Sequence, residues 1–108
     1  MPEKKYPKWY NFIKSKHGGF LEGVERLGQS LHQAGPLDEK TANLIQLAAA
    51  AAIRSEGAVH SHARRAFQAG ASPEEIVHAL ILLTSTIGFP TTSAALSWVY
   101  DVLGEKMD

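Results

Sequence analysis

The sequence contains no cysteine, and that single absence excludes several kinds of chemistry. Disulfides, zinc–thiolate sites, iron–sulfur ligation and thiol redox catalysis all require a sulfur that this chain does not have. The sequence also lacks any run of about 18 apolar residues, the length that spans a membrane, and its first residues lack the apolar region of a signal peptide. We therefore expect a cytoplasmic protein with no membrane partner.

The chain has no excess of charge of either sign, because 11 Lys and Arg residues balance 11 Asp and Glu residues. This balance argues against a strongly basic nucleic-acid binder and an acidic interaction tail, so no nucleic-acid partner is predicted. Lysines and aromatic residues do alternate over residues 1–17, as in some nucleic-acid or membrane-surface patches. Trp9, Phe12 and Ile13 nevertheless recur at helical spacing, and we interpret them as the apolar stripe of a first helix.

Helix signals recur along the 108 residues, with short breaks and without a clear strand pattern. The length and the 44% hydrophobic content fit one globular domain over residues 1–108. We predict an all-α fold of about six helices, delimited by Gly, Pro, Ser and Asp signals. These helices are expected up to about residue 17, over 20–34, from 38 to a break at Gly57, over 58–69, over 72–86 and over 91–103.

Two of the predicted helices are too apolar for the surface of one small domain. The run 44–53 includes five consecutive alanines, and Leu80–Leu83 makes the fifth helix apolar on most faces. A bundle of this size cannot readily surround both helices, so we predict a homo-oligomer whose subunits cover one another's apolar faces. The alternative is a monomer whose first two helices wrap the core.

The two histidines of the predicted fourth helix, His60 and His62, are the first candidates for a metal site. On a helix their side chains point about 200° apart, so both rings cannot easily reach one ion. Neither histidine has an Asp or Glu three or four residues further along the chain. No metal site is therefore predicted, and a hydrogen-bonded histidine at a helix or subunit boundary is the simpler interpretation.

Asn43 and Gln46 are amide side chains on the alanine-rich third helix, and Ser55 lies near its end. A buried amide must find hydrogen-bond partners. Two interpretations stay open at this point. In the first, an amide faces His62 across a helix pair and fixes the tautomer of the imidazole. In the second, the same residues form a small polar pocket in which His62 acts as a general acid or base.

Two stretches, residues 35–49 (Gly-Pro-Leu-Asp-Glu-Lys-Thr-Ala-Asn-Leu-Ile-Gln-Leu-Ala-Ala) and residues 62–80, resemble the carboxymuconolactone decarboxylase family, which includes the AhpD-like alkylhydroperoxidases. The most specific part is the junction Ala-Gly-Ala-Ser-Pro-Glu-Glu-Ile at 69–76, and the likeness extends over about 35–103. The resemblance implies an AhpD-like helical bundle that assembles as a homo-oligomer, a trimer or a hexamer, with sites near the subunit interfaces.

The redox members that the chain resembles have a Glu, then eleven residues, then Cys-x-x-Cys-x-x-x-His. On this sequence the pattern falls at Asn43, Ser55, Ala58 and His62, and only the histidine matches. An amide cannot accept a proton as a carboxylate does, and neither Ser55 nor Ala58 has a thiol to oxidise. A thiol peroxidase is therefore excluded, although the family label would suggest peroxiredoxin-type activity.

The decarboxylase branch of the family also lacks the thiol pair and acts on a lactone acid without a cofactor. By resemblance, His62 would supply a proton to the new carbon–hydrogen bond, and Arg64 or Arg65 would hold an anionic substrate. We accordingly predict a catalytic group of His62, Asn43 and Ser55, and a substrate-binding group of Arg64, Arg65, His60 and Gln46. The alternative is a non-catalytic assembly protein, in which the arginines form a solvated or subunit-bridging face.

Overall fold

The fold is described by a computed structural model of the chain, and residues 6–107 are placed well enough to be described. In that part of the chain all regular structure is helical, which confirms the predicted all-α class. The chain divides into two compact units, Met1–Pro36 and Leu37–Asp108, which are described separately. The first unit contains α1 (Lys8–Lys16) and α2 (Gly18–Gln33); the second contains α3 (Glu39–Ala52), α4 (Glu56–Gln68), α5 (Pro73–Ile81), α6 (Thr84–Ile87), α7 (Phe89–Leu103) and the 3₁₀ turn η1 (Gly104–Lys106).

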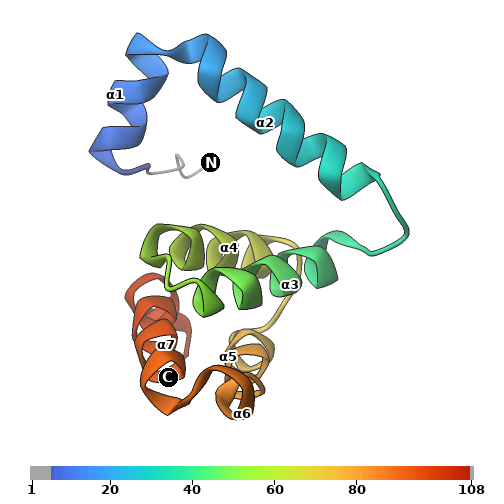
Figure 1. The fold of residues 1–108 in the computed structure, drawn as a ribbon, viewed down its shortest axis with the longest axis vertical. Coiled ribbons are helices and arrows are strands. Elements are labelled where there is room, and N and C mark those ends of the chain that lie inside the picture. The colour runs from blue at the N-terminus through green and yellow to red at the C-terminus, as the bar shows by residue number, and fades with distance from the viewer. Residues whose placement is uncertain (1–5, 108) are drawn as a thin grey trace. The chain divides into compact units, whose positions relative to one another are not determined.

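The core of the second unit forms where α3, α4, α5 and α7 meet (Figure 1). The helices α3 and α4 run side by side in opposite directions, and alanines on both helices let their backbones approach closely. Larger side chains from α5 and α7 fill the remaining space. The buried core residues are Leu47, Ala50, Ala51, Val59, Ala63, Ala66, Ala71, Ile76, Leu80, Ala95, Val99 and Leu103.

The turn between α3 and α4 differs from the prediction. Gly57 does not end a helix but lies in the first turn of α4, where a glycine costs little because several N–H groups there have no helical partner. The break comes earlier, at Arg54, which adopts a left-handed conformation with φ 59°. The Ser55 N–H donates to the carbonyl of Ala50 at 3.0 Å and the Arg54 N–H to that of Ala51 at 3.0 Å, which is the Schellman pattern of a helix end.

The end of α4 and the start of α5 follow the sequence signals. Gly70, with φ 104°, closes α4, and the Ala71 N–H donates to the carbonyl of Ala66 at 2.9 Å. Ser72 then caps α5 in a reciprocal capping box with Glu75, with Pro73 at the first helical position. Local backbone chemistry at these positions was sufficient to place the boundary.

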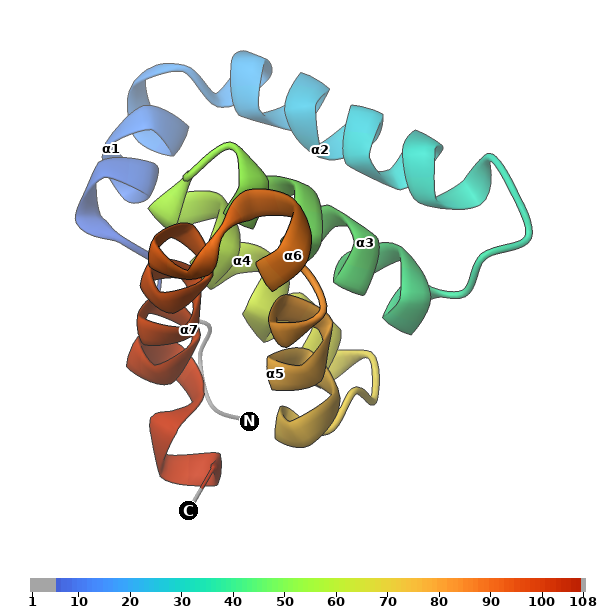
Figure 2. The same cartoon turned by 60° about the horizontal axis from the view of Figure 1, so that its bottom comes forward.

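The predicted helix over 72–86 is two helices. The helix α5 ends at Ile81, and a separate single turn, α6, links it to α7 (Figure 2). The Thr84 hydroxyl donates to the carbonyl of Ile81 at 2.7 Å, which satisfies an acceptor that a continuing helix would use for a backbone N–H. The helix α7 begins at Phe89, earlier than predicted, because Gly88 precedes it with φ 88°.

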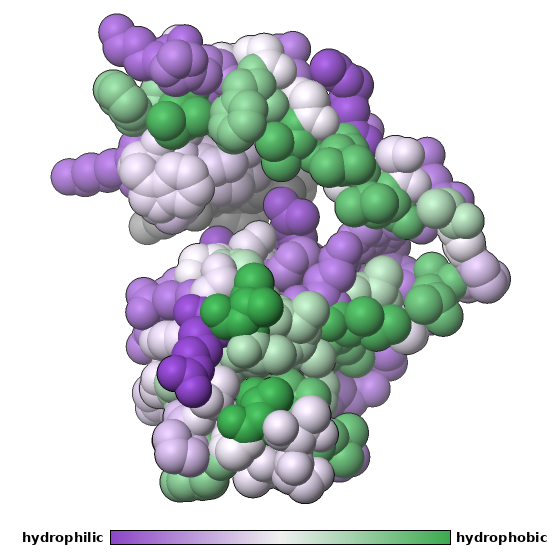
Figure 3. Space-filling model, viewed as in Figure 1, coloured by the Kyte–Doolittle hydropathy of each residue, from purple (hydrophilic) through white to green (hydrophobic). Residues whose placement is uncertain are grey.

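The first unit buries little of its apolar surface. Helix α1 has no buried residue, and Trp9 and Phe12 are 63% and 59% exposed. The ring of Tyr10 stacks on Tyr6 at 4.6 Å between centroids, and its hydroxyl donates to Oε1 of Glu25 at 2.8 Å. On α2 four apolar residues at helical spacing form a stripe that is about half to two-thirds exposed, and Figure 3 shows apolar surface along this helix: Phe20, Val24, Leu27 and Leu31.

The two helices predicted to be buried on all faces are only partly covered by the other helices of the second unit. Ile45 and Ile53 at α3, and Ile81 and Leu82 at the end of α5, are each at least half exposed. None of the helices in residues 6–107 combines the length and apolarity that a bilayer-crossing segment needs.

Candidate functional site

Asn43 and His62 face each other across the α3–α4 pair. Oδ1 of Asn43 lies 3.3 Å from Nδ1 of His62. The amide Nδ2 of Asn43 donates to the backbone carbonyl of Glu39, one turn earlier, at 2.9 Å. Asn43 is buried, with 3% of its surface exposed, and His62 is half-buried. The amide therefore joins a backbone group of α3 to the imidazole of α4.

The orientation of the Asn43 amide determines which nitrogen of His62 carries a proton. Because Nδ2 is used as a donor to a carbonyl, the oxygen is the atom turned to the ring, and an amide oxygen can only accept. Nδ1 of His62 must then be the protonated nitrogen in the neutral ring. The contact confirms that an amide faces His62 across a helix pair, which both interpretations of the sequence allow.

Ser55 is the N-cap residue of α4, and its side chain makes no capping hydrogen bond. Seven residues separate it from His62, so at 1.5 Å per residue the two lie roughly 10 Å apart along the helix axis, on nearly the same face. Ala58 lies between them, one turn before His62. The positions that carry thiols in redox relatives thus lie on one line of α4 with His62.

His60 points away from this group, toward α7. Its Nε2 lies 3.3 Å from Oδ2 of Asp101, with 22% of the His60 side chain exposed. The structure therefore gives His60 a partner on α7 and does not bring it to Asn43, as the wide angle between positions 60 and 62 on a helix requires. Its predicted role in substrate binding is not supported by this arrangement.

The remaining predicted binding residues differ in their relation to His62. Arg65 is exposed and lies three residues after His62, on the same face of α4. Arg64 is half-buried and lies four residues after His60, on the face that turns to α7. Gln46 is half-buried on α3, one turn after Asn43. Helix geometry therefore favours Arg65 over Arg64 as the cation nearest to the imidazole.

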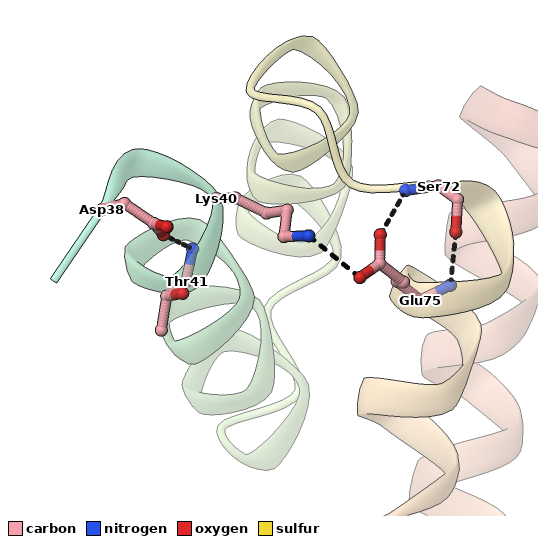
Figure 4. A network of polar contacts seen from close by, with 5 residues as sticks. All are labelled: Asp38, Lys40, Thr41, Ser72 and Glu75. Atoms are coloured by element: carbon pink, nitrogen blue, oxygen red, sulfur yellow. Dashed lines mark hydrogen bonds and ion pairs between the residues drawn. The ribbon is translucent and has the colours of Figure 1, made fainter.

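A separate polar network joins the first turns of α3 and α5 (Figure 4). Nζ of Lys40 lies 3.0 Å from Oε2 of Glu75, whose Oε1 accepts from the Ser72 N–H at 2.9 Å. The pKa of Glu75 is lowered by the Ser72 N–H and then by Lys40. The pKa of Asp38 is lowered because the Thr41 N–H donates to its carboxylate at 2.7 Å. The sequence indicated both caps but not the ion pair, which depends on the packing of two helices.

A small open pocket lies on the second unit at another position, between the end of α3 and the first three turns of α7. Its volume is about 270 Å³, and its lining residues are Arg54, Pro90, Thr91, Ala94 and Trp98. None of these belongs to the predicted site. No local sequence signal indicated it, because it depends on the packing of α7 against the end of α3.

We found no group of three or more His, Cys, Asp or Glu side chains in residues 6–107 that could hold a metal ion. The polar group that the structure places against His62 from the facing helix is the amide of Asn43.

Comparison with known proteins identifies the class. The family model of the carboxymuconolactone decarboxylase family matches residues 18–101, and the chain belongs to this family. A relative in Methanocaldococcus jannaschii, itself described as uncharacterised, is 28% identical over 94 residues, which cover 87% of this chain and 88% of that protein. No solved structure matches the chain. The family match includes α2 as well as the second unit, so it begins earlier than the resemblance read from the sequence.

Proposed function

We propose that this protein binds a small carboxylate-bearing molecule beside His62 and transfers a proton to it, without thiol chemistry and without a cofactor. The observation that supports this proposal is the hydrogen bond between Asn43 and Nδ1 of His62. Nδ1 carries a proton in both the neutral and the charged ring, so the contact with Asn43 persists whichever form is present. Proton exchange then takes place at Nε2.

The family name gives the reaction class, a decarboxylation of a lactone acid. In such a reaction the bond between the departing carboxylate and its carbon breaks, carbon dioxide leaves, and the electron pair stays on the carbon. The charged ring of His62 donates its Nε2 proton to that carbon and becomes neutral, and a proton from water restores it. Arg65 lies one turn after His62 on the same face of α4. We propose that it binds a second carboxylate of the substrate, one that is not lost as carbon dioxide.

The difference between Asn43 and a carboxylate is important for this chemistry. An amide orients the ring without adding a negative charge, so it does not hold the imidazole in its charged form as an ion pair would. His62 can then both lose and regain a proton. Ser55 and Gln46 are proposed to complete the polar surroundings through a hydroxyl and an amide.

The direct test is turnover of carboxymuconolactone by the purified protein, followed as release of carbon dioxide. We expect turnover by the wild type, a loss of at least about 100-fold in His62→Gln, as expected for removal of a general acid, and little change in His60→Gln. His60→Gln is the matched control because that ring is bound to Asp101 on the other face of the same helix. Absence of turnover by the wild type, or equal rates in both variants, would contradict the proposal.

A second proposal concerns assembly, and its support is the exposed apolar surface of the helices. We propose that the chain forms a homo-oligomer, a trimer or a hexamer, in which the stripe on α2 is covered by another subunit. Helix α1, the other helix of the first unit, leaves this row of four large apolar side chains about half exposed or more, and an apolar row of this kind is typical of a contact surface. Without turnover, a stable oligomer would favour the non-catalytic alternative.

A further inference from the structure

The pocket at the end of α3 combines one cation with an otherwise largely apolar wall. Arg54, at the end of α3, is one of its lining residues, and the rest of the lining comes from the first three turns of α7: Pro90, Thr91, Ala94 and Trp98. The pocket contains neither His62 nor its partner Asn43. It is therefore a different position from the site of the proposed function, and the inference drawn below does not depend on that function.

The backbone of Arg54 is held in a conformation that arginine does not favour. Two helices of this unit end in the same Schellman pattern, and the left-handed position is Gly70 in one and Arg54 in the other. Glycine adopts this conformation without steric cost, whereas a side chain with a Cβ is strained there. The chain thus keeps an arginine at a position where a glycine would stabilise the fold, and strain of this kind is typical of functional positions.

The charge of Arg54 is not used within the described structure. In residues 6–107 its guanidinium is exposed and takes part in no ion pair or hydrogen bond. A guanidinium matches a carboxylate with two parallel hydrogen bonds, and this geometry makes arginine the preferred carboxylate ligand in proteins. The exposed cation among the lining residues therefore indicates an anionic group on the ligand.

Trp98 supplies the second element of recognition. It is half-buried and contributes an indole to the pocket wall, beside the apolar surfaces of Pro90 and Ala94. Aromatic surfaces favour stacked or edge-on contact with another ring. The volume of about 270 Å³ lies just below the roughly 300–1,000 Å³ of pockets that take drug-sized molecules, so one ring with a short substituent fits best.

From these contacts we propose that the Arg54–Trp98 pocket binds a small aromatic monocarboxylate, with its carboxylate on the guanidinium of Arg54 and its ring against Trp98. Both anchors belong to the second unit, one at the end of α3 and one on α7. Binding would link the end of α3 to the middle of α7. The ligand's charge and its ring are each recognised by one residue, so each contribution can be removed separately.

The experiment uses the indole of Trp98 as its own reporter. The sequence has two tryptophans, so Trp9→Phe leaves Trp98 as the sole tryptophan, which is excited selectively at about 295 nm, where the three tyrosines barely absorb. The full chain with this substitution is titrated with benzoate and, in parallel, with the neutral isostere benzamide. We expect a saturable change in Trp98 fluorescence with benzoate and an affinity for benzamide at least about tenfold lower, because the charge-assisted contact is lost.

Arg54→Gly is the decisive variant, because glycine keeps the left-handed backbone while it removes the guanidinium. We expect its melting temperature to be equal or higher and its affinity for benzoate to fall at least about tenfold, so weaker binding cannot be attributed to unfolding. His62→Gln should bind benzoate as the parent does, which separates this site from the proposed proton-transfer site. Equal affinity for benzoate and benzamide, unchanged binding by Arg54→Gly, or the absence of a saturable signal would each overturn the proposal. A fluorescence change that depends on the protein concentration and not on the benzoate concentration would indicate a contact between copies of the chain. That result would also overturn the pocket proposal.

Discussion

The side-chain oxygen of Asn43 accepts a hydrogen bond from Nδ1 of His62, 3.3 Å away on the neighbouring helix. This contact connects α3 to α4, and in the proposed function it leaves Nε2 of His62 as the nitrogen that exchanges a proton. Because the Asn43 side chain is an amide, the group that faces His62 from α3 carries no charge.

Removal of the Asn43 side chain should destabilise the fold. In Asn43→Ala, Nδ1 of His62 and the Glu39 carbonyl each lose the hydrogen bond to this side chain, and the loss of a hydrogen bond costs about 0.5–1.5 kcal/mol. Urea denaturation at neutral pH measures the difference. Gln68→Ala, an exposed polar residue at the end of α4, is the control and should change stability by less than about 0.5 kcal/mol. Equal effects of the two substitutions would contradict the importance of the contact.

A carboxylate at position 43 should change the titration of His62. In Asn43→Asp a negative charge lies beside the ring, and an opposite charge at this distance favours the protonated form. The midpoint of His62 protonation, followed by NMR of the imidazole, should move to higher pH than in the wild type. Asn43→Ser, which keeps a neutral acceptor, should not produce this rise. A midpoint in Asn43→Asp at or below that of the wild type would contradict the prediction.

The Glu75 network should make the fold sensitive to acid. The folded-state pKa of Glu75 lies below the ordinary 4.5. The ionised Glu75 therefore stabilises the fold at any pH above its pKa in the unfolded chain. This stabilisation is lost as the pH falls through the lower pKa of the folded state. Glu75→Gln should lower the urea midpoint at pH 7 and make the decrease between pH 7 and pH 3 shallower. Glu74→Gln, on the same exposed turn, is the matched control, and an identical pH profile for both variants would contradict the assignment.

The two left-handed helix ends should respond to substitution in opposite directions. Gly70→Ala should destabilise by about 1 kcal/mol because φ 104° is strained for a residue with a Cβ, although no atom lies within 4 Å of the added carbon. Arg54→Gly should be neutral or stabilising by up to about 1 kcal/mol. Thermal unfolding of both variants gives the comparison. A large loss of stability in Arg54→Gly would show that the arginine side chain supports the fold.

The stripe on α2 should determine the oligomeric state. Leu27→Glu places a charge in the middle of the stripe and should reduce the molar mass measured by light scattering after size-exclusion chromatography. Gln29→Glu, an exposed position elsewhere on the same helix, adds the same charge and should leave the mass unchanged. A monomeric wild type, or equal masses for the two variants, would contradict the assembly proposal.

The sequence predicted those parts of the fold that depend on local backbone chemistry. The capping box at Ser72, the glycine end at Gly70 and the Asp38 cap are set by neighbouring residues, so they could be recognised without a structure. The end of α3 could not, because an arginine stands where a glycine is expected. The division of the predicted fifth helix was also missed, since a threonine hydroxyl that bonds back to a carbonyl is compatible with a continuous helix.

The candidate site was predicted only in part, because local patterns show which face of a helix a residue lies on but not which helix it meets. Helical periodicity separates His60 from His62 by about half a turn, and a buried amide on the facing helix is the natural partner of one of them. Which helix each histidine meets depends on tertiary packing, and so do the pairing of His60 with Asp101 and the Arg54–Trp98 pocket. These contacts join residues far apart in the chain, and no local pattern indicates them.

The most direct test of the central claim is ¹⁵N NMR of the His62 ring, with and without a saturated γ-lactone carboxylate that cannot lose carbon dioxide. We predict that the free neutral ring carries its proton on Nδ1 and that the ligand changes the resonance of Nε2, while the same ligand leaves the spectrum of His60 unchanged. A neutral ring protonated on Nε2, or an imidazole whose resonances do not respond to the ligand, would contradict the account.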